Sequence, residues 1–146
     1  MDLPLPSETI FHVIESSIKE YRKFAQRNIS NKIKDMTIDQ GMLLLFLNKY
    51  PDLTQNEIAE LVFKDNASMT RMINTMVQKK YLKRSMNPED RRRYKIEITN
   101  KGKDVLETLP PIIHHNRKSS LKGISKNELN QLEIILSKIR TNCIKI

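Results

Sequence analysis

The sequence predicts a mainly α fold of the α+β class, in which amphipathic helices surround one small β-hairpin. Apolar residues recur at intervals of three and four through most of the 146-residue chain, which is the pattern of one buried helix face. Only residues 81–99 show the alternation of strands, around a turn that contains proline and acidic residues. The length suits a single domain, so we expect residues 1–146 to form one.

Positive charge is concentrated in the middle of the chain. The formal net charge is +9, and residues 54–103 carry 12 basic and 6 acidic side chains, whereas residues 1–53 are neutral overall. This basic block predicts a surface that binds a polyanion. Cys143 is the only cysteine, which excludes an intramolecular disulfide and a cysteine metal cluster. No apolar run reaches about 18 residues and no signal peptide is recognisable, so we expect a cytoplasmic protein without a membrane partner.

Two helices are expected in the first third of the chain. Ser7 can cap a helix over residues 8–28. Its apolar stripe consists of Ile10, Val13, Ile14, Ile18, Tyr21 and Phe24. Thr37 and Gln40 form a capping box for a second helix. Residues 41–50 of that helix are apolar nearly all round, as expected for a helix buried among others.

A helix–turn–helix is expected next. Leu53 stands between chain breakers and suits a short strand that would join the sheet of the hairpin. A second capping box begins at Thr54, and the inward residues of the short helix that follows are Ile58, Leu61 and Val62. Asp65 or Asn66 can cap the next helix, over residues 67–80. Its buried stripe consists of Met69, Met72, Ile73, Met76 and Val77, and its opposite face is polar.

A basic β-hairpin follows the two helices. Residues 81–85 and 93–99 have the pattern of strands, and residues 87–90 have the composition of a tight turn. The tip carries Arg91, Arg92 and Arg93. Three like charges at a tip repel one another unless a polyanion or the neighbouring Glu89 and Asp90 compensate them.

Two further helices are expected after the hairpin. Thr99 or Asn100 caps the first, and Pro110 and Pro111 predict a kink or a short break in it. A third capping box at Ser125 starts the last helix. The apolar stripe of that helix consists of Leu129, Leu132, Ile135, Leu136 and Ile139.

A helix–turn–helix with a basic hairpin, here over residues 53–102, has the layout of a winged helix that reads double-stranded DNA. The second helix can enter the major groove, where arginine pairs with guanine, asparagine pairs with adenine and hydroxyl groups hold phosphates. Arginines at the hairpin tip suit a narrow minor groove, where the negative potential is enhanced. A solvated polar face would explain the helix pair alone, but the arginine-rich hairpin at this spacing favours DNA.

Six short motifs occur in order through this module. They are Leu53-Thr54, Glu57-Ile58-Ala59, Ser68-x-Thr70-Arg71-x-Ile73, Leu82-x-Arg84, Asp90-x-Arg92 and Ile98-Thr99-x-x-Gly102. With these motifs the chain resembles the MarR (multiple antibiotic resistance regulator) family of winged helix-turn-helix transcriptional regulators. One departure is the missing glycine between recognition helix and strand, where Lys80 or Tyr81 must take a left-handed conformation.

The resemblance implies a homodimer that binds a pseudo-palindromic operator as a transcriptional regulator, expected to be a repressor. Helices over residues 7–30 and 103–146 would form the dimer. Arg92 would enter the minor groove while Asp90 orients the turn, and Arg84 would pair near the wing or hold a phosphate. The residues expected to contact DNA are Thr54, Ala67, Ser68, Thr70, Arg71, Asn74, Arg84, Asp90, Arg91, Arg92 and Arg93.

The resemblance also implies release of DNA by a small aromatic or lipophilic anion held between the dimerisation and DNA-binding regions. The expected pocket walls are Ile14, Met42, Phe46, Pro110 and Ile113. The alternative is an architectural or protein-interacting winged helix without ligand control.

No catalytic residue, metal site or cofactor is expected. His114 and His115 are adjacent and cannot both face one site on a helix, and no nucleophile or phosphate-loop signature occurs. We therefore do not expect an enzyme.

Overall fold

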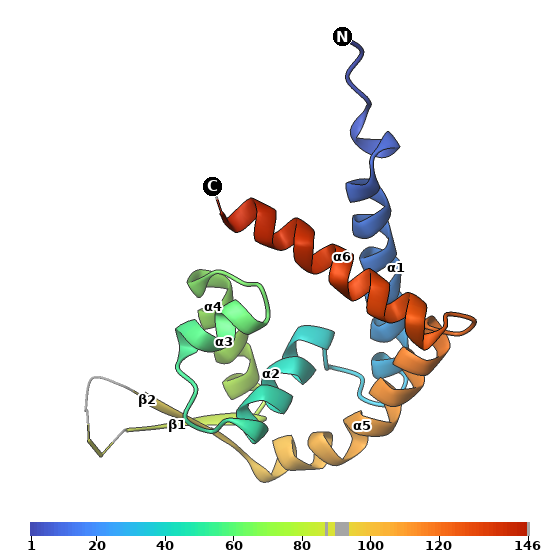
Figure 1. Ribbon diagram of the computed structural model, residues 1–146. Helices are drawn as coiled ribbons and strands as arrows, with labels where there is room; N and C mark the ends of the chain where they lie inside the picture. Colours follow the sequence, from blue (N-terminus) through green and yellow to red (C-terminus); the bar gives the residue numbers. More distant parts are fainter. Residues whose placement is uncertain (87, 90–93, 146) are drawn as a thin grey trace. The chain divides into compact units, whose positions relative to one another are not determined.

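The computed structural model describes residues 1–86, 88–89 and 94–145 (Figure 1). The elements run in the order η1 (Pro6–Glu8), α1 (Ile10–Ser30), α2 (Ile38–Lys49), α3 (Gln55–Leu61), α4 (Asn66–Gln78), β1 (Leu82–Met86), β2 (Tyr94–Ile98), α5 (Asn100–Ser120) and α6 (Lys126–Ile144). They form two compact units, Met1–Asn116 and Arg117–Ile146. The predicted mainly α fold with one small hairpin is confirmed.

The three predicted capping boxes are present and start α2, α3 and α6. In the first, the Gln40 backbone N–H donates to Thr37 Oγ1 over 3.2 Å, and the Thr37 N–H donates to Gln40 Oε1 over 3.1 Å. Each box satisfies backbone donors that have no partner within the helix, which is why the helix begins there.

The start of α1 differs from the prediction. Pro6 opens a short 3-10 turn instead, within which the Leu5 N–H donates to the Glu8 carboxylate over 2.8 Å. Ser7 lies inside that turn and does not cap a helix. The chain is extended at Thr9, with φ −106° and ψ 160°, and α1 begins only after it. Its end, at Ser30, lies close to the predicted one.

The hydrophobic core of the first unit is built around α2. Leu43 and Leu44 are completely buried, and the core around them includes Ile58 of α3, Ile73 of α4 and Leu109 of α5. The other buried residues of α4, Met69 and Met76, also match the predicted stripe. Residues 41–47 are buried or half-buried, as expected for a helix surrounded by neighbours, whereas residues 48–50 at its end are exposed.

The inward face of α3 differs from the prediction at one position. Leu61 is 40% exposed, whereas Ala59 and Ile58 are buried. Ala59 lies about 100° from Ile58 around the helix, and Leu61 lies on the other side of Ile58. The buried arc of this short helix is therefore turned toward Ala59, and a small side chain allows close approach to the core.

The sheet contains the two strands of the hairpin among the described residues. The strands are antiparallel, with Leu82 opposite Ile98 and Arg84 opposite Ile96. The prediction of a short strand at Leu53 is wrong. The Leu53 N–H instead donates to the carbonyl of Tyr50 over 3.2 Å, in a turn that closes the end of α2.

Helix α5 continues through both of its prolines, so of the predicted kink or short break, the break is absent. Pro110 and Pro111 lack the N–H groups that would bond to the carbonyls of Leu106 and Glu107. Both prolines are exposed, so solvent can satisfy these two carbonyls, while the rest of the helix keeps its own hydrogen bonds. The helix is capped by Thr99, whose hydroxyl accepts from the Gly102 N–H over 3.2 Å.

Gly102 of α5 lies against the base of the hairpin, between Tyr81 before β1 and Ile98 at the end of β2. A Cβ atom at this position would stand 2.5 Å from the Tyr81 carbonyl oxygen and 2.7 Å from Ile98 Cγ2. The first distance involves backbone that is itself bonded, since the Thr99 N–H donates to the same oxygen over 3.1 Å. Glycine is therefore required here by close approach, not by an unusual backbone conformation.

Replacing Gly102 with alanine is expected to lower the free energy of unfolding by about 1–3 kcal/mol, the usual cost of overpacking. The loss is expected although alanine favours a helix over glycine by about 1 kcal/mol. Chemical denaturation of the two proteins measures it. Lys103→Ala, at the exposed neighbouring position, is the control. Unchanged stability of Gly102→Ala would contradict the close packing.

Candidate nucleic-acid interface

Helices α3 and α4 form the predicted helix–turn–helix. The turn between them contains Phe63, which is 93% exposed and has a left-handed φ of 57°. This left-handed conformation was not predicted, because glycine is the usual sign of such a position and the turn contains none. The Lys64 N–H closes the turn by donating to the Ala59 carbonyl over 2.9 Å.

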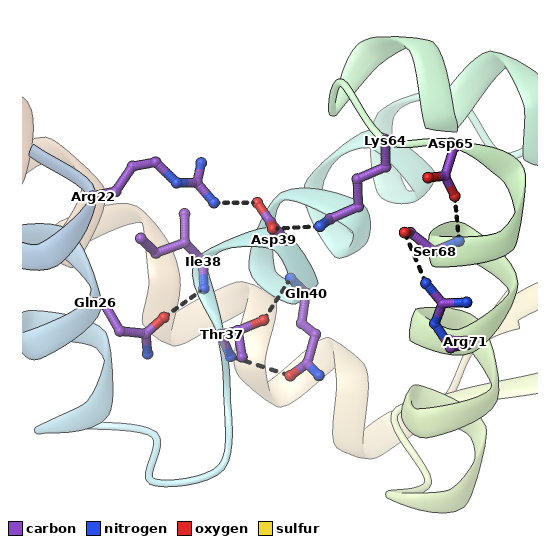
Figure 2. Close-up of polar contacts among 10 residues, drawn as sticks. All are labelled: Arg22, Gln26, Thr37, Ile38, Asp39, Gln40, Lys64, Asp65, Ser68 and Arg71. Atoms are coloured by element: carbon purple, nitrogen blue, oxygen red, sulfur yellow. Dashed lines mark hydrogen bonds and ion pairs between the residues drawn. The ribbon is translucent and has the colours of Figure 1, made fainter. Parts of the chain in front are cut away.

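Asp65 is the residue that caps α4, so the choice between it and Asn66 is resolved. Its Oδ1 accepts from the Ser68 backbone N–H over 2.6 Å (Figure 2). This hydrogen bond is the main cause that lowers the pKa of Asp65 below its ordinary value. The cap orients the first turn of α4, on which the predicted base-reading residues begin.

The exposed face of α4 carries most of the residues predicted to contact DNA. Ala67, Thr70, Arg71 and Asn74 are exposed, and Ser68 is half-buried. Arg71 Nη2 donates to Ser68 Oγ over 3.0 Å, one turn back along the helix (Figure 2). The arginine is thus held along the helix surface with its remaining guanidinium donors free of the core.

Helix α3 contributes a residue that the sequence analysis missed. Gln55 Nε2 donates to Thr70 Oγ1 over 2.6 Å, and that hydroxyl donates to the Asn66 carbonyl over 2.9 Å. Gln55 is the first residue of α3 and directly follows the capping residue Thr54. Its place at the start of a helix was the available signal, because polar side chains there project beyond the helix end.

Thr54 itself is engaged in its own helix. Its hydroxyl accepts from the Glu57 N–H over 3.2 Å and donates to Glu57 Oε1 over 2.9 Å. These contacts explain the threonine by helix capping, so its contact with DNA stays a prediction.

Strand β1 brings a further predicted residue to the exposed face of α4. Arg84 Nη2 donates to Asn74 Oδ1. Lys80 makes this possible, because its left-handed φ of 66° turns the chain from α4 into β1, as one of the two predicted alternatives required. Asp90, Arg91, Arg92 and Arg93 lie outside the described residues, and their roles stay predictions.

The start of β1 is fastened to the connection between α1 and α2. The Tyr81 hydroxyl donates to Asp35 Oδ1 over 2.6 Å, and Lys101 Nζ lies 4.4 Å from the centroid of the Tyr81 ring. Burial, followed by the Asp35 hydrogen bond, raises the pKa of Tyr81 to about 12. These contacts fix where the strand leaves α4, and therefore where Arg84 stands.

An ion-pair triad joins three elements of the first unit. Asp39, in the first turn of α2, accepts from Arg22 of α1 over 2.7 Å and pairs with Lys64 of the helix–turn–helix turn over 3.0 Å (Figure 2). Burial raises the pKa of Asp39, but the hydrogen bonds and charges of Arg22 and Lys64 outweigh it, so the net pKa lies below the ordinary value. The triad ties the turn before α4 to α1.

Replacing Asp39 with asparagine is expected to lower the free energy of unfolding at pH 7 by about 1–2 kcal/mol. Because the folded pKa of Asp39 is depressed, its stabilisation is present above the unfolded pKa of about 3.9 and is lost as the pH falls through the folded value. The difference between the two proteins should therefore shrink below about pH 4. Denaturation at pH 7 and pH 3 measures it, with exposed Asp52→Asn as control. An equal difference at both pH values would refute the ionic role.

The residues predicted to line an effector pocket all lie in the first unit. Met42, Phe46 and Ile113 are partly buried and pack against the core, Ile14 is half-buried on α1, and Pro110 is exposed. A pocket among them stays a prediction.

Within residues 1–86, 88–89 and 94–145, no three His, Cys, Asp or Glu side chains are grouped to hold a metal ion. None of the helices in this part of the chain is long and apolar enough to cross a membrane.

The fold and the polar face of α4 define a winged helix-turn-helix protein. Within this class of protein, residues 34–93 match the model of the MarR family. A structure of BpsR from Bordetella bronchiseptica, described with its regulation by 6-hydroxynicotinic acid, has a TM-score of 0.82 at 20% identity and covers 95% of this chain and 98% of its own. Over residues 34–93 the chain is similar to the MarR family, and its fold is that of solved structures of MarR-family proteins.

Two of the similar structures contain DNA. A mutant MarR from E. coli complexed with operator DNA has a TM-score of 0.80 at 21% identity, over 89% of this chain and 92% of that one. The MepR–DNA complex from S. aureus has a TM-score of 0.81 at 21% identity, over 95% and 99%. At these identities the likeness establishes the shared fold.

Proposed function

We propose that the protein is a homodimeric, sequence-specific DNA-binding regulator of transcription that acts as a repressor in the cytoplasm. The observation that carries this is the exposed polar face of α4, whose side chains are braced from α3 and from β1. A solvated helix face needs no such bracing, whereas a surface that reads base edges gains from side chains held in one orientation. The DNA complexes of MarR and MepR support the same use of the fold.

In this proposal each chain is one domain. Its residues 53–102 read DNA, and its helices over residues 7–30 and 103–146 form the dimer with a second chain. Both helical regions carry large apolar side chains that are exposed in the single chain. On α1 these are Ile10, Phe11, Val13 and Ile18, each 53–58% exposed. On α6 they include Leu132 and Ile135, which are 50% and 55% exposed. Burial in a second copy would remove this apolar surface from water.

The proposed dimer presents two α4 helices to half-sites roughly 10 bp apart, one helical turn of DNA. The net charge of +9 on each chain supplies a salt-dependent attraction to phosphates. Arg91, Arg92 and Arg93 would extend the contact into the minor groove. The residues proposed to contact DNA remain those predicted from the sequence, with Gln55 added as a support for Thr70.

Footprinting on DNA that includes the region upstream of the protein's own coding sequence tests the proposal. The expected result is discrete protection with two-fold symmetry and a spacing of roughly one helical turn. Featureless coverage would instead support the architectural alternative, and no protection at low salt would refute DNA binding altogether.

We also propose that a small aromatic or lipophilic anion releases the DNA. BpsR, whose DNA binding is described as regulated by 6-hydroxynicotinic acid, supports an effector of this chemistry. Such a ligand can shift affinity for DNA only by as much as it prefers one arrangement of the two α4 helices over the other. Titration of the operator complex with aromatic carboxylic acids tests it, and Phe46→Ala should weaken the response.

A further inference from the structure

Asn74 and Arg84 form a pair within the proposed DNA-reading surface, although they come from different elements. Asn74 is exposed in the second half of α4, and Arg84 is exposed in the middle of β1. Arg84 Nη2 donates to Asn74 Oδ1. A guanidinium group carries donors only, so the atom of the amide that faces Arg84 must be its oxygen. The amide NH2 group of Asn74 therefore points away from the arginine.

This orientation matters for how asparagine reads a base. A free asparagine amide presents an acceptor and a donor side by side, and it pairs through both with the N6 amino group and N7 of adenine. Arg84 takes one of the two lone pairs of the oxygen and places a positive charge beside it, so the NH2 group is the better partner left for a base edge. Such a group meets two acceptors on guanine, O6 and N7, or the O4 acceptor of thymine, whereas adenine offers it N7 alone beside the N6 donor.

The position of Arg84 is set by the fold and not by its neighbours in sequence alone. The left-handed Lys80 reverses the chain after α4, and the Tyr81–Asp35 hydrogen bond holds the start of β1. Pairing of Arg84 with Ile96 across the sheet fixes its register. The guanidinium is therefore brought to Asn74 by a rigid frame, as a positioning group must be.

We propose that Arg84 is a positioning residue that sets the base preference of Asn74, by holding the amide so that it favours guanine or thymine over adenine. The inference rests on the proposed DNA-binding function and assigns a determinant of its specificity. It differs from a phosphate contact by Arg84, because a phosphate contact carries no sequence information.

The test is selection of binding sites from a random duplex library with wild type, Asn74→Ala, Arg84→Ala and Lys83→Ala. Lys83 is the matched control, because it is exposed on the same strand, carries the same charge and pairs with Glu97 over 3.5 Å. Circular dichroism checks that each variant is folded. Positions read by Asn74 are those whose base preference is lost in Asn74→Ala.

At those positions, wild type and Lys83→Ala are expected to favour guanine or thymine over adenine by at least about fivefold. Arg84→Ala should lose this preference or move it toward adenine, while the other positions of the site keep theirs. In affinity measurements, the double variant Arg84→Ala, Asn74→Ala should discriminate among bases at these positions no less than Asn74→Ala alone, because Arg84 acts there through Asn74.

Two results would overturn the inference while leaving DNA binding intact. One is an Arg84→Ala site identical to that of wild type, with affinity reduced uniformly, as for a phosphate contact. The other is adenine at the Asn74 position in the wild-type site. If wild type enriches no sequence at all, the proposed function itself fails, and the inference fails with it.

Discussion

Placing glutamate at both Leu132 and Ile135 of α6 is expected to yield a monomer that binds the operator roughly 10²–10⁴-fold more weakly than wild type. These side chains are 50% and 55% exposed in the single chain, and they belong to the apolar stripe predicted for α6. Two carboxylates buried in a dimer interface would lose their hydration without partners, so the dimer would dissociate. A monomer engages one half-site and loses the gain from binding two at once.

Sedimentation velocity measures the mass of the variant, and titration of labelled operator measures its affinity. Glutamate is a good helix former, so α6 itself should persist, which circular dichroism can check. The matched control places glutamate at Asn130 and Thr141, which are exposed on the side of α6 away from Leu132. The control adds the same negative charge and should remain a dimer. A dimeric Leu132→Glu, Ile135→Glu protein would refute the role of this stripe.

Replacing Arg71 with alanine is expected to weaken operator binding by about 1–3 kcal/mol, a factor of roughly 5–150. Arg71 is exposed on α4, where it donates to Ser68 and its charge acts on Asp65, so its removal should leave the fold intact. If the guanidinium reads guanine, the loss should be large on the operator and small on non-specific DNA.

Fluorescence anisotropy with operator and random duplexes at several salt concentrations separates the two contributions. Lys122→Ala removes one positive charge at an exposed position between α5 and α6 and serves as control. Arg71→Lys keeps the charge but not the bidentate geometry, so it should recover non-specific affinity more fully than specific affinity. Equal losses on both duplexes would assign Arg71 to phosphate.

The elements that the sequence predicted are those decided by interactions between near neighbours. The capping boxes at Thr37, Thr54 and Ser125 each close over three residues, so their hydrogen bonds need no tertiary partner. The apolar stripe of α4 follows from helix periodicity. Because the chain must reverse after α4, either Lys80 or Tyr81 had to be left-handed, and Lys80 is the residue that is.

The sequence-based errors lie where a local signal competed with the surroundings. Leu61 fits an inward spacing, but the core meets α3 on the side of Ala59. Pro110 and Pro111 predicted a kink or a short break, but packing of Val105 and Leu109 against the core holds α5 as one helix, so the break is the part of that prediction that is wrong. In each case tertiary burial outweighed a propensity of a few kcal/mol at most.

By itself, then, the sequence determined the helix order, the hairpin, the winged helix class and most of the residues on the polar face of α4. Only the tertiary structure decided which of these side chains meet: Gln55 with Thr70, Arg84 with Asn74, and Asp39 with Arg22 and Lys64. Each pair joins two elements, so it depends on the angle and separation at which they pack. Those quantities are set by the shared core and leave no periodic trace in the sequence.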